Sequence, residues 1–151
     1  MSLPNTDPVY SRAGDVQSAQ WINSGTILGP TANTAQDGTG TLYPVFQADT
    51  TNGGFCQKIA FQSIGTTSLT VCRIYISSIT GSWTGNTASN TALFTEVTLP
   101  AVNLSQTAQS PHIEVPINYA LPAGYRLVLS FGTSTGAAGN GWSPIAIAGK
   151  Y

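Results

Sequence analysis

The sequence predicts an all-β protein, an antiparallel β-sandwich of about eight strands with an extended N-terminal arm. Charged residues make up only 7% of the 151 residues, against about 25% in an average soluble protein, and Ser, Thr, Asn and Gly supply the polarity instead. Short segments of alternating apolar and polar residues recur between clusters of Gly, Asn, Thr and Pro, and no segment has a helical apolar period. A hydrophobic content of 41% with a formal net charge of −1 is typical of a chain that folds.

The chain divides into two expected parts, an extended arm at residues 1–15 and a single β-sandwich domain at residues 16–151. Pro4, Pro8 and Gly14 lie in the arm, which shows no apolar periodicity. An arm of this kind can fasten a subunit to its neighbour. The arm residues chosen as candidates for a partner contact are Leu3, Tyr10 and Arg12.

Eight period-2 segments are the expected strands. They lie near residues 18–28, 41–48, 55–63, 68–77, 92–99, 112–121, 125–133 and 142–148. The sixth alternates most clearly, with an apolar face of Ile113, Val115, Ile117, Tyr119 and Leu121. The seventh repeats this pattern with Tyr125, Leu127, Leu129 and Phe131. Two sheets that each have one apolar face can bury these faces by packing against each other. This arrangement predicts a jelly-roll or immunoglobulin-like sandwich.

Turn and breaker residues refine this expectation. The segment Leu121-Pro122-Ala123-Gly124 suits a type I turn, so a tight hairpin is expected between the sixth and seventh strands. Three prolines fall inside expected strands, where a missing N–H is tolerated mainly at edges or bulges. These prolines are Pro44, Pro116 and Pro144. The expected end loops are residues 29–40, 80–91 and 132–141.

The two cysteines are predicted to be free thiols. Pairing the segments 55–63 and 68–77 as a hairpin places Cys56 and Cys72 on opposite faces, where no disulfide can form. In that register Ile64 opposes Thr67, and Cys72 opposes Ile59. One face would carry Phe55, Ile59, Phe61, Cys72, Ile74 and Ile76, and the other Cys56, Lys58, Arg73 and Tyr75. Free thiols suit a reducing cytoplasm, and Cys72 is expected to be a small core residue.

Composition and motifs argue against several classes of function. The five basic residues are scattered along the chain, which disfavours nucleic-acid binding. These are Arg12, Lys58, Arg73, Arg126 and Lys150. No signal-peptide pattern and no apolar run of membrane-spanning length is found in the sequence, so neither secretion nor a membrane partner is expected.

No catalytic site and no cofactor are predicted. A nucleophile activated by histidine would have to use His112, the one histidine, which lies in an ordinary strand pattern. His112 and Glu114 share a strand face, but a metal site needs further ligands, so they are predicted to form a structural surface pair. The carboxylates show no local pairing of the kind that glycosidases use. The glycine-rich segments at 37–41 and 136–141 contain no Lys of a phosphate-binding loop.

The three tryptophans differ in their surroundings. Trp21 and Trp142 lie in expected strands and are predicted to be core residues because of their large apolar area. Trp83 lies in the loop around residues 79–86 and is the best single candidate for a partner or ligand contact. The remaining candidates for partner contacts are the strand residues Lys58, Arg73 and Tyr75.

Several stretches resemble a known group of proteins. They are ANTAQDGTGT at residues 32–41, RIYI at 73–76, LFTEV at 93–97, LPAGYRL at 121–127 and AGKY at 148–151. Together they resemble small virion-associated proteins of tailed bacteriophages over residues 30–151. The most specific parts are the DGTGT segment, the LPAGY turn and the terminal Tyr. Members of that group usually end in Gly-Gly-Asp-Tyr, whereas this chain ends in Ala-Gly-Lys-Tyr.

The resemblance implies a phage structural protein, most of all a capsid decoration (cement) protein on the surface of the virion. Such a protein is made in the host bacterial cytoplasm, binds the major capsid protein and stabilises the assembled head. A homo-oligomer is expected, with a trimer favoured, and no small-molecule substrate. Two alternatives stay open at this point: a tail, neck or fibre component of the virion, and a carbohydrate-binding module that uses Trp83.

Overall fold

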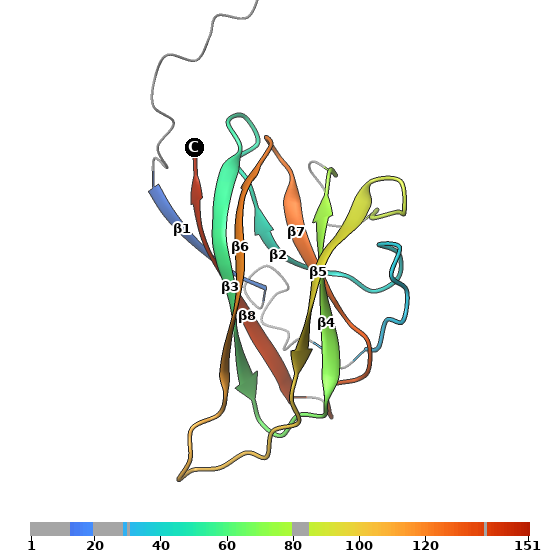
Figure 1. Ribbon diagram of the computed structural model, residues 1–151, viewed down its shortest axis with the longest axis vertical. Coiled ribbons are helices and arrows are strands. Elements are labelled where there is room, and N and C mark those ends of the chain that lie inside the picture. The colour runs from blue at the N-terminus through green and yellow to red at the C-terminus, as the bar shows by residue number, and fades with distance from the viewer. Residues whose placement is uncertain (1–12, 20–28, 30, 80–84, 138) are drawn as a thin grey trace, which may run out of the picture.

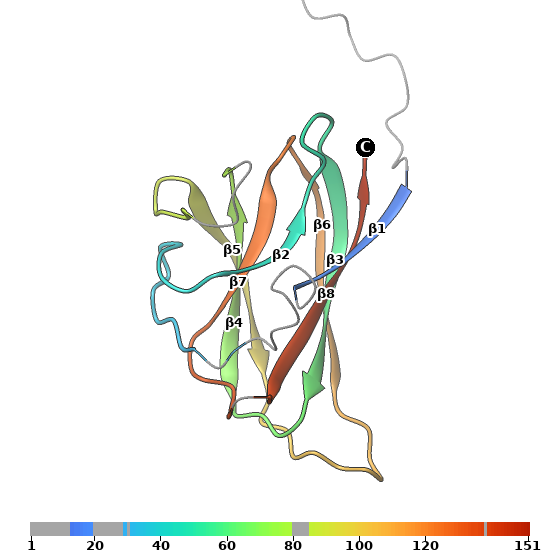
Figure 2. The same cartoon turned by 180° about the vertical axis from the view of Figure 1, so that it is seen from behind.

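The computed structural model describes residues 13–19, 29, 31–79, 85–137 and 139–151. These residues contain eight strands in two antiparallel sheets, so the predicted β-sandwich is confirmed. The strands are β1 (Ala13–Ser18), β2 (Tyr43–Gln47), β3 (Gly54–Ile64), β4 (Thr70–Ser77), β5 (Thr91–Leu99), β6 (His112–Leu121), β7 (Arg126–Phe131) and β8 (Gly141–Lys150). Figures 1 and 2 show the two sheets as facing layers.

The order of the strands identifies the sandwich as a jelly roll. The first sheet has the order β1-β8-β3-β6 and the second has the order β2-β7-β4-β5. Among consecutive strands, only β4 and β5 are neighbours in one sheet, and every other connection passes from one sheet to the other. An immunoglobulin-like sandwich instead keeps several consecutive strands side by side. Of the two architectures predicted, the jelly roll is therefore the one observed.

The core lies between the inner faces of the two sheets. Its largest fully buried apolar side chains include Phe46 on β2, Phe61 on β3 and Trp142 on β8. Burial of each large apolar side chain contributes about 1.5–3 kcal/mol to the hydrophobic stabilisation. The alternation predicted for β7 is confirmed, because Leu127, Leu129 and Phe131 all point into this core. Trp142 is a core residue as predicted, whereas Trp21 lies outside the described residues.

The first described strand was not predicted from the sequence. β1 covers Ala13–Ser18 and pairs with β8, from Ala13 opposite Lys150 to Ser18 opposite Ile145. The strand expected at 18–28 lies almost wholly outside the described residues, so it stays a prediction. Residues 13–15, assigned to the arm by sequence, therefore belong to the sandwich. Residues 1–12 and 20–28 lie outside the described residues.

The predicted hairpin between the two cysteine-containing strands is wrong. β3 pairs with β6 and β8, whereas β4 pairs with β5 and β7, so the two strands belong to different sheets. The assignment of faces changes as well, because a bulge at Gln57 turns Cys56 inward and Phe55 outward. Cys56 and Cys72 are both fully buried in the core. Both thiols are free, as predicted, although the register used to predict this is not the observed one.

The turn between the sixth and seventh strands also differs from the prediction. The amide of Tyr125 donates a hydrogen bond to the Pro122 carbonyl at 3.1 Å, and Gly124 has a φ of 74°. This places Gly124 at the third position of the turn, where a left-handed residue is typical of type II rather than type I. The turn is tight, but it carries the chain from one sheet to the other and does not close a hairpin.

The prolines occupy positions that tolerate a missing N–H. Pro44 lies on β2 and Pro116 on β6, and both strands are sheet edges with a register shift close to the proline. Pro144 differs from these two, because it lies on β8, an interior strand in the order of the first sheet. Its pairing with Phe61 of β3 lies one residue beyond Ile145, where the pairing of β8 with β1 ends.

We expect both thiols to react very slowly in the folded protein. Burial raises the pKa of Cys56 from 9.0 to about 12, and burial likewise raises the pKa of Cys72. Because the thiolate is the nucleophile, a chromogenic disulfide reagent at pH 8 should modify the native protein far more slowly than the protein unfolded in guanidinium. Rapid modification of both thiols without unfolding would contradict this burial.

The raised pKa values of Cys56 and Cys72 also determine how the stability of the protein changes with pH. The folded state keeps the thiol protons at pH values where the unfolded chain loses them, so burial of the neutral thiols stabilises fully below pH 9. That stabilisation should be lost as the pH rises from about 9 towards 12.

Candidate functional site

The two outer faces of the sandwich differ, because a segment of the chain itself covers the second sheet. Residues 31–42 run along the outside of the β2-β7-β4-β5 sheet before they enter β2 (Figures 1 and 2). Tyr75 donates a hydrogen bond from its hydroxyl to the Ala35 carbonyl at 3.1 Å. Arg73 donates from Nη1 to the Asn33 carbonyl at 3.0 Å. We call residues 31–42 the covering segment.

Asn33 organises the covering segment from within. Its side-chain amide donates to the carbonyls of Thr39 and Thr41 at 2.8 and 2.9 Å, and its Oδ1 accepts from the Ala35 amide at 3.0 Å. Its backbone amide donates to the Phe131 carbonyl of β7 at 2.7 Å. A side chain that is only 7% exposed thus satisfies backbone groups that a loop would otherwise leave to water.

Two of the predicted partner contacts therefore serve the protein's own chain. Tyr75 is fully buried under the covering segment. Arg73 is mostly buried, and its Nε lies 2.9 Å from Glu96 Oε1 in addition to its contact with Asn33. These side chains do not share a face with Lys58 and Cys56, as the predicted hairpin required, because they belong to the other sheet.

Lys58 lies on the outer face of the first sheet, next to the predicted surface pair. Its Nζ is 2.7 Å from Glu114 Oε1, and His112 Nε2 is 3.3 Å from the same oxygen. The Lys58 hydrogen bond is the main cause, and the His112 hydrogen bond the second, of a lowered Glu114 pKa. The described residues contain no group of three His, Cys, Asp or Glu that could hold a metal ion. They also contain no helix long and apolar enough to cross a membrane.

The other predicted contact residues cannot be placed. Leu3, Tyr10, Arg12 and Trp83 lie outside the described residues, so their roles stay predictions.

Exposed apolar side chains gather where the edges of the two sheets meet. Phe94 on β5 and Tyr119 on β6 lie on different sheets, yet their ring centroids are 6.1 Å apart. They are 39% and 48% exposed, and Leu93 beside Phe94 is 41% exposed. Phe94 is the extra residue of a bulge, because Ile74 pairs with Thr95 and Tyr75 with Leu93. We call Leu93, Phe94 and Tyr119 the aromatic rim.

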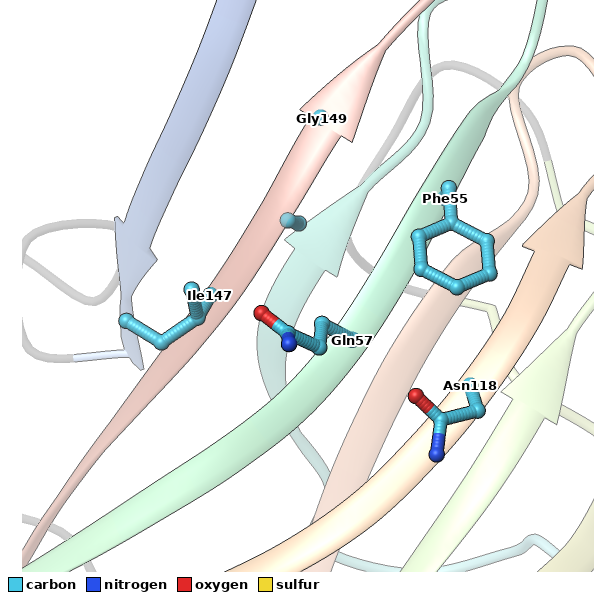
Figure 3. Close-up of a pocket in the computed structure, with 6 residues that line it drawn as sticks. Phe55, Gln57, Asn118, Ile147 and Gly149 are labelled. Carbon is cyan, nitrogen blue, oxygen red and sulfur yellow. The ribbon is translucent and has the colours of Figure 1, made fainter. Parts of the chain in front are cut away.

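A second feature is a shallow hollow on the outer face of the first sheet, with a volume of about 390 Å³. We call it the bulge hollow. Its lining comes from three adjacent strands and consists of Phe55, Gln57, Asn118, Ile147, Ala148 and Gly149. Figure 3 shows Gln57 between Ile147 of β8 and Asn118 of β6, with the Phe55 ring close by on β3.

Irregular strand pairing creates the bulge hollow. On β3, Gln57 opposes no residue of β8, because Cys56 pairs with Ala148 and Lys58 with Ile147. On the other side, Ile117 and Asn118 of β6 together oppose Gln57. Asn118 has a φ of 48°, and among the described residues it alone combines a positive φ with a side chain other than that of glycine. Bulges of this kind redirect side chains and are common near functional sites.

Sequence reasoning missed both the aromatic rim and the bulge hollow. Tyr119 was assigned to the apolar face of its strand, and it does oppose the buried Cys56. Its exposure follows from the position of β6 at the sheet edge, which no local pattern reveals. The one local signal for the hollow is Asn118 itself, since Asn adopts left-handed backbone more readily than most residues.

Comparisons with known proteins add little to this description. No family model matches the chain, and no curated protein matches it. One solved structure, titled "Structure of infectious bursal disease virus Gt strain", is similar at a TM-score of 0.27 and 14% identity. The match covers 98% of this chain and 36% of that chain, so this chain spans about a third of its length.

Substitutions at Asn118 should separate the backbone requirement from the side chain. Asn118→Ala should lower the free energy of unfolding by about 1 kcal/mol, because alanine pays about 1–2 kcal/mol for left-handed backbone. Asn118→Gly should stay within about 0.5 kcal/mol of the wild type, since glycine adopts this conformation freely but loses more entropy on folding. Urea denaturation measures both, and equal stability of the two variants would speak against a strained position.

The Glu114 carboxyl should respond to its lysine partner. In Lys58→Met the pKa of Glu114 should rise towards 4.5, because the ammonium hydrogen bond is the main cause of its lowering. His112→Gln should give a smaller rise. NMR titration of the side-chain carboxyl carbon measures both shifts. Since the folded-state pKa is the lower one, the contribution of the pair is present above about pH 4.5 and lost as the pH falls.

Proposed function

We propose that this protein is a structural component of a tailed-bacteriophage virion, namely a decoration protein that binds the assembled head and stabilises it. The single observation that carries the proposal is the aromatic rim, an exposed apolar cluster at an open edge of a weakly charged sandwich. The jelly roll supports it by analogy, since viral capsid and lectin domains use this architecture. The resemblance of residues 30–151 to virion-associated proteins supports it independently.

The aromatic rim has the chemistry of a protein contact. Aromatic side chains dominate binding energy at protein interfaces, and contiguous exposed apolar groups mark interaction surfaces. Phe94 and Tyr119 hold each other in place across the two sheets, so little side-chain entropy is lost when a partner covers them. The major capsid protein is the partner we propose, with the decoration protein acting as a symmetric oligomer, most simply a trimer.

Stabilisation of the head follows from linkage. A protein that binds the assembled shell, and not its separated subunits, adds its binding free energy to the stability of the shell. Residues 1–12 are proposed to reach a neighbouring subunit. The contribution of each copy is small, but many copies act on one shell.

The test is binding of the purified protein to expanded capsids of its phage. We expect cosedimentation with the capsids and a higher temperature of capsid disruption. Phe94→Ser and Tyr119→Ser should each weaken binding by about tenfold or more, as truncation of an interface anchor does. Leu69→Ser is the matched control, because Leu69 is 62% exposed in a loop away from the rim and its variant should bind like the wild type.

Two results would count against the proposal. Wild-type affinity of both rim variants would remove the rim as the contact. Location of labelled protein on the tail in particle images would favour the alternative of a tail, neck or fibre component.

A further inference from the structure

The bulge hollow presents two amide side chains that the protein does not use. Gln57 and Asn118 are exposed, and neither side chain has a hydrogen-bond partner among the described residues. An amide offers two N–H donors and one carbonyl acceptor. Figure 3 shows both amides beside the same hollow, on neighbouring strands. The register shifts on both sides of Gln57 and the positive φ of Asn118 place the two amides beside this hollow.

The remainder of the lining is apolar. Phe55 and Ile147 are half-buried, so part of each side chain still faces the hollow. Gly149, which also lines the hollow, has no side chain. The ring of Phe55 carries partial negative charge on its face, which attracts the C–H groups of a ligand that packs against it.

The described residues that line the hollow include no charged side chain. The nearby Lys58 is already paired with Glu114 at 2.7 Å. A ligand for this site therefore needs hydroxyl groups for the amides and C–H groups for the aromatic ring, with no charge of its own. A neutral pyranose has this combination on its two faces.

We propose that the bulge hollow binds a neutral carbohydrate, with Gln57 and Asn118 hydrogen-bonded to sugar hydroxyls and the sugar ring packed on Phe55. A volume of about 390 Å³ lies within the range of about 300–1000 Å³ that is usual for ligand sites. Because the hollow is shallow, it takes one or two sugar units of a longer glycan and leaves the others in solvent. This site is separate from the aromatic rim, and its occupancy does not depend on binding to a capsid.

A single hollow binds such a ligand weakly, and the presence of many copies on one particle would raise the overall affinity. If many copies decorate one particle, as proposed above, their hollows act together on a repeating polysaccharide. That step rests on the proposed function, whereas binding by the isolated protein does not.

The experiment uses the full chain, labelled with ¹⁵N and free of capsids. Galactose, N-acetylglucosamine and maltose are titrated as neutral probes, with glucuronic acid as the charged comparison. We expect shift changes at Phe55, Gln57 and Asn118 with at least one neutral probe. Gln57→Ala and Asn118→Gly should each weaken that binding about fivefold, the usual effect of losing one hydrogen bond.

Gln62→Ala is the matched control for Gln57→Ala, because Gln62 lies on the same strand and outer face but outside the hollow. It should bind like the wild type. No shift change with any neutral probe, changes confined to other surfaces, or binding of glucuronic acid alone would each overturn the proposal. None of these results bears on capsid binding, so a failure here is distinguishable from a failure of the proposed function.

Discussion

Burial of one face of each strand is the constraint from which the exposed surfaces follow. Cys56 and Ile59 both face the core, although they are three positions apart and a regular strand would place them on opposite sides. One residue between them must therefore leave the regular pairing, and the structure puts Gln57 outside. Because Cys56 and Ile59 both have to face the core, the polar side chain of Gln57 lies on the outer face of the sheet. The bulge hollow is a consequence of core packing as much as a candidate site.

The second sheet is buried on both faces along β7, unlike the first sheet. All six residues of β7 are buried, so both faces of that strand are covered. The core covers one face, and the covering segment lies over the other, held through Asn33 and Tyr75. Arg73 contacts both Glu96 and this segment, so the charge of Arg73 is paired within the protein itself. The covering segment therefore lies between this part of the second sheet and any partner.

How far the sequence predicts this structure depends on whether a feature is local. Alternation located seven of the eight strands, because it reports which side chains must be buried. It missed β1, whose sequence AGDVQS has no apolar face and forms a strand because β8 offers it an edge. The choice of partners for β3 and β4 was also wrong, since a short connection between two strands does not reveal a change of sheet. The bulge at Gln57 depends on the pairing of β3 with both β6 and β8, and the rim depends on a contact between β5 and β6 of different sheets, so neither candidate site could be predicted from a local pattern.

The two candidate surfaces share one strand, β6. Asn118 and Tyr119 are adjacent residues, yet Asn118 lines the hollow on the outer face while Tyr119 turns towards the other sheet to meet Phe94. Successive residues of a strand point to opposite faces, so the sheet itself separates the two surfaces. A partner that covers the rim can therefore leave the hollow open to solvent. Any coupling between the two has to pass through the backbone of β6, and the left-handed conformation of Asn118 is the place where that strand is least regular.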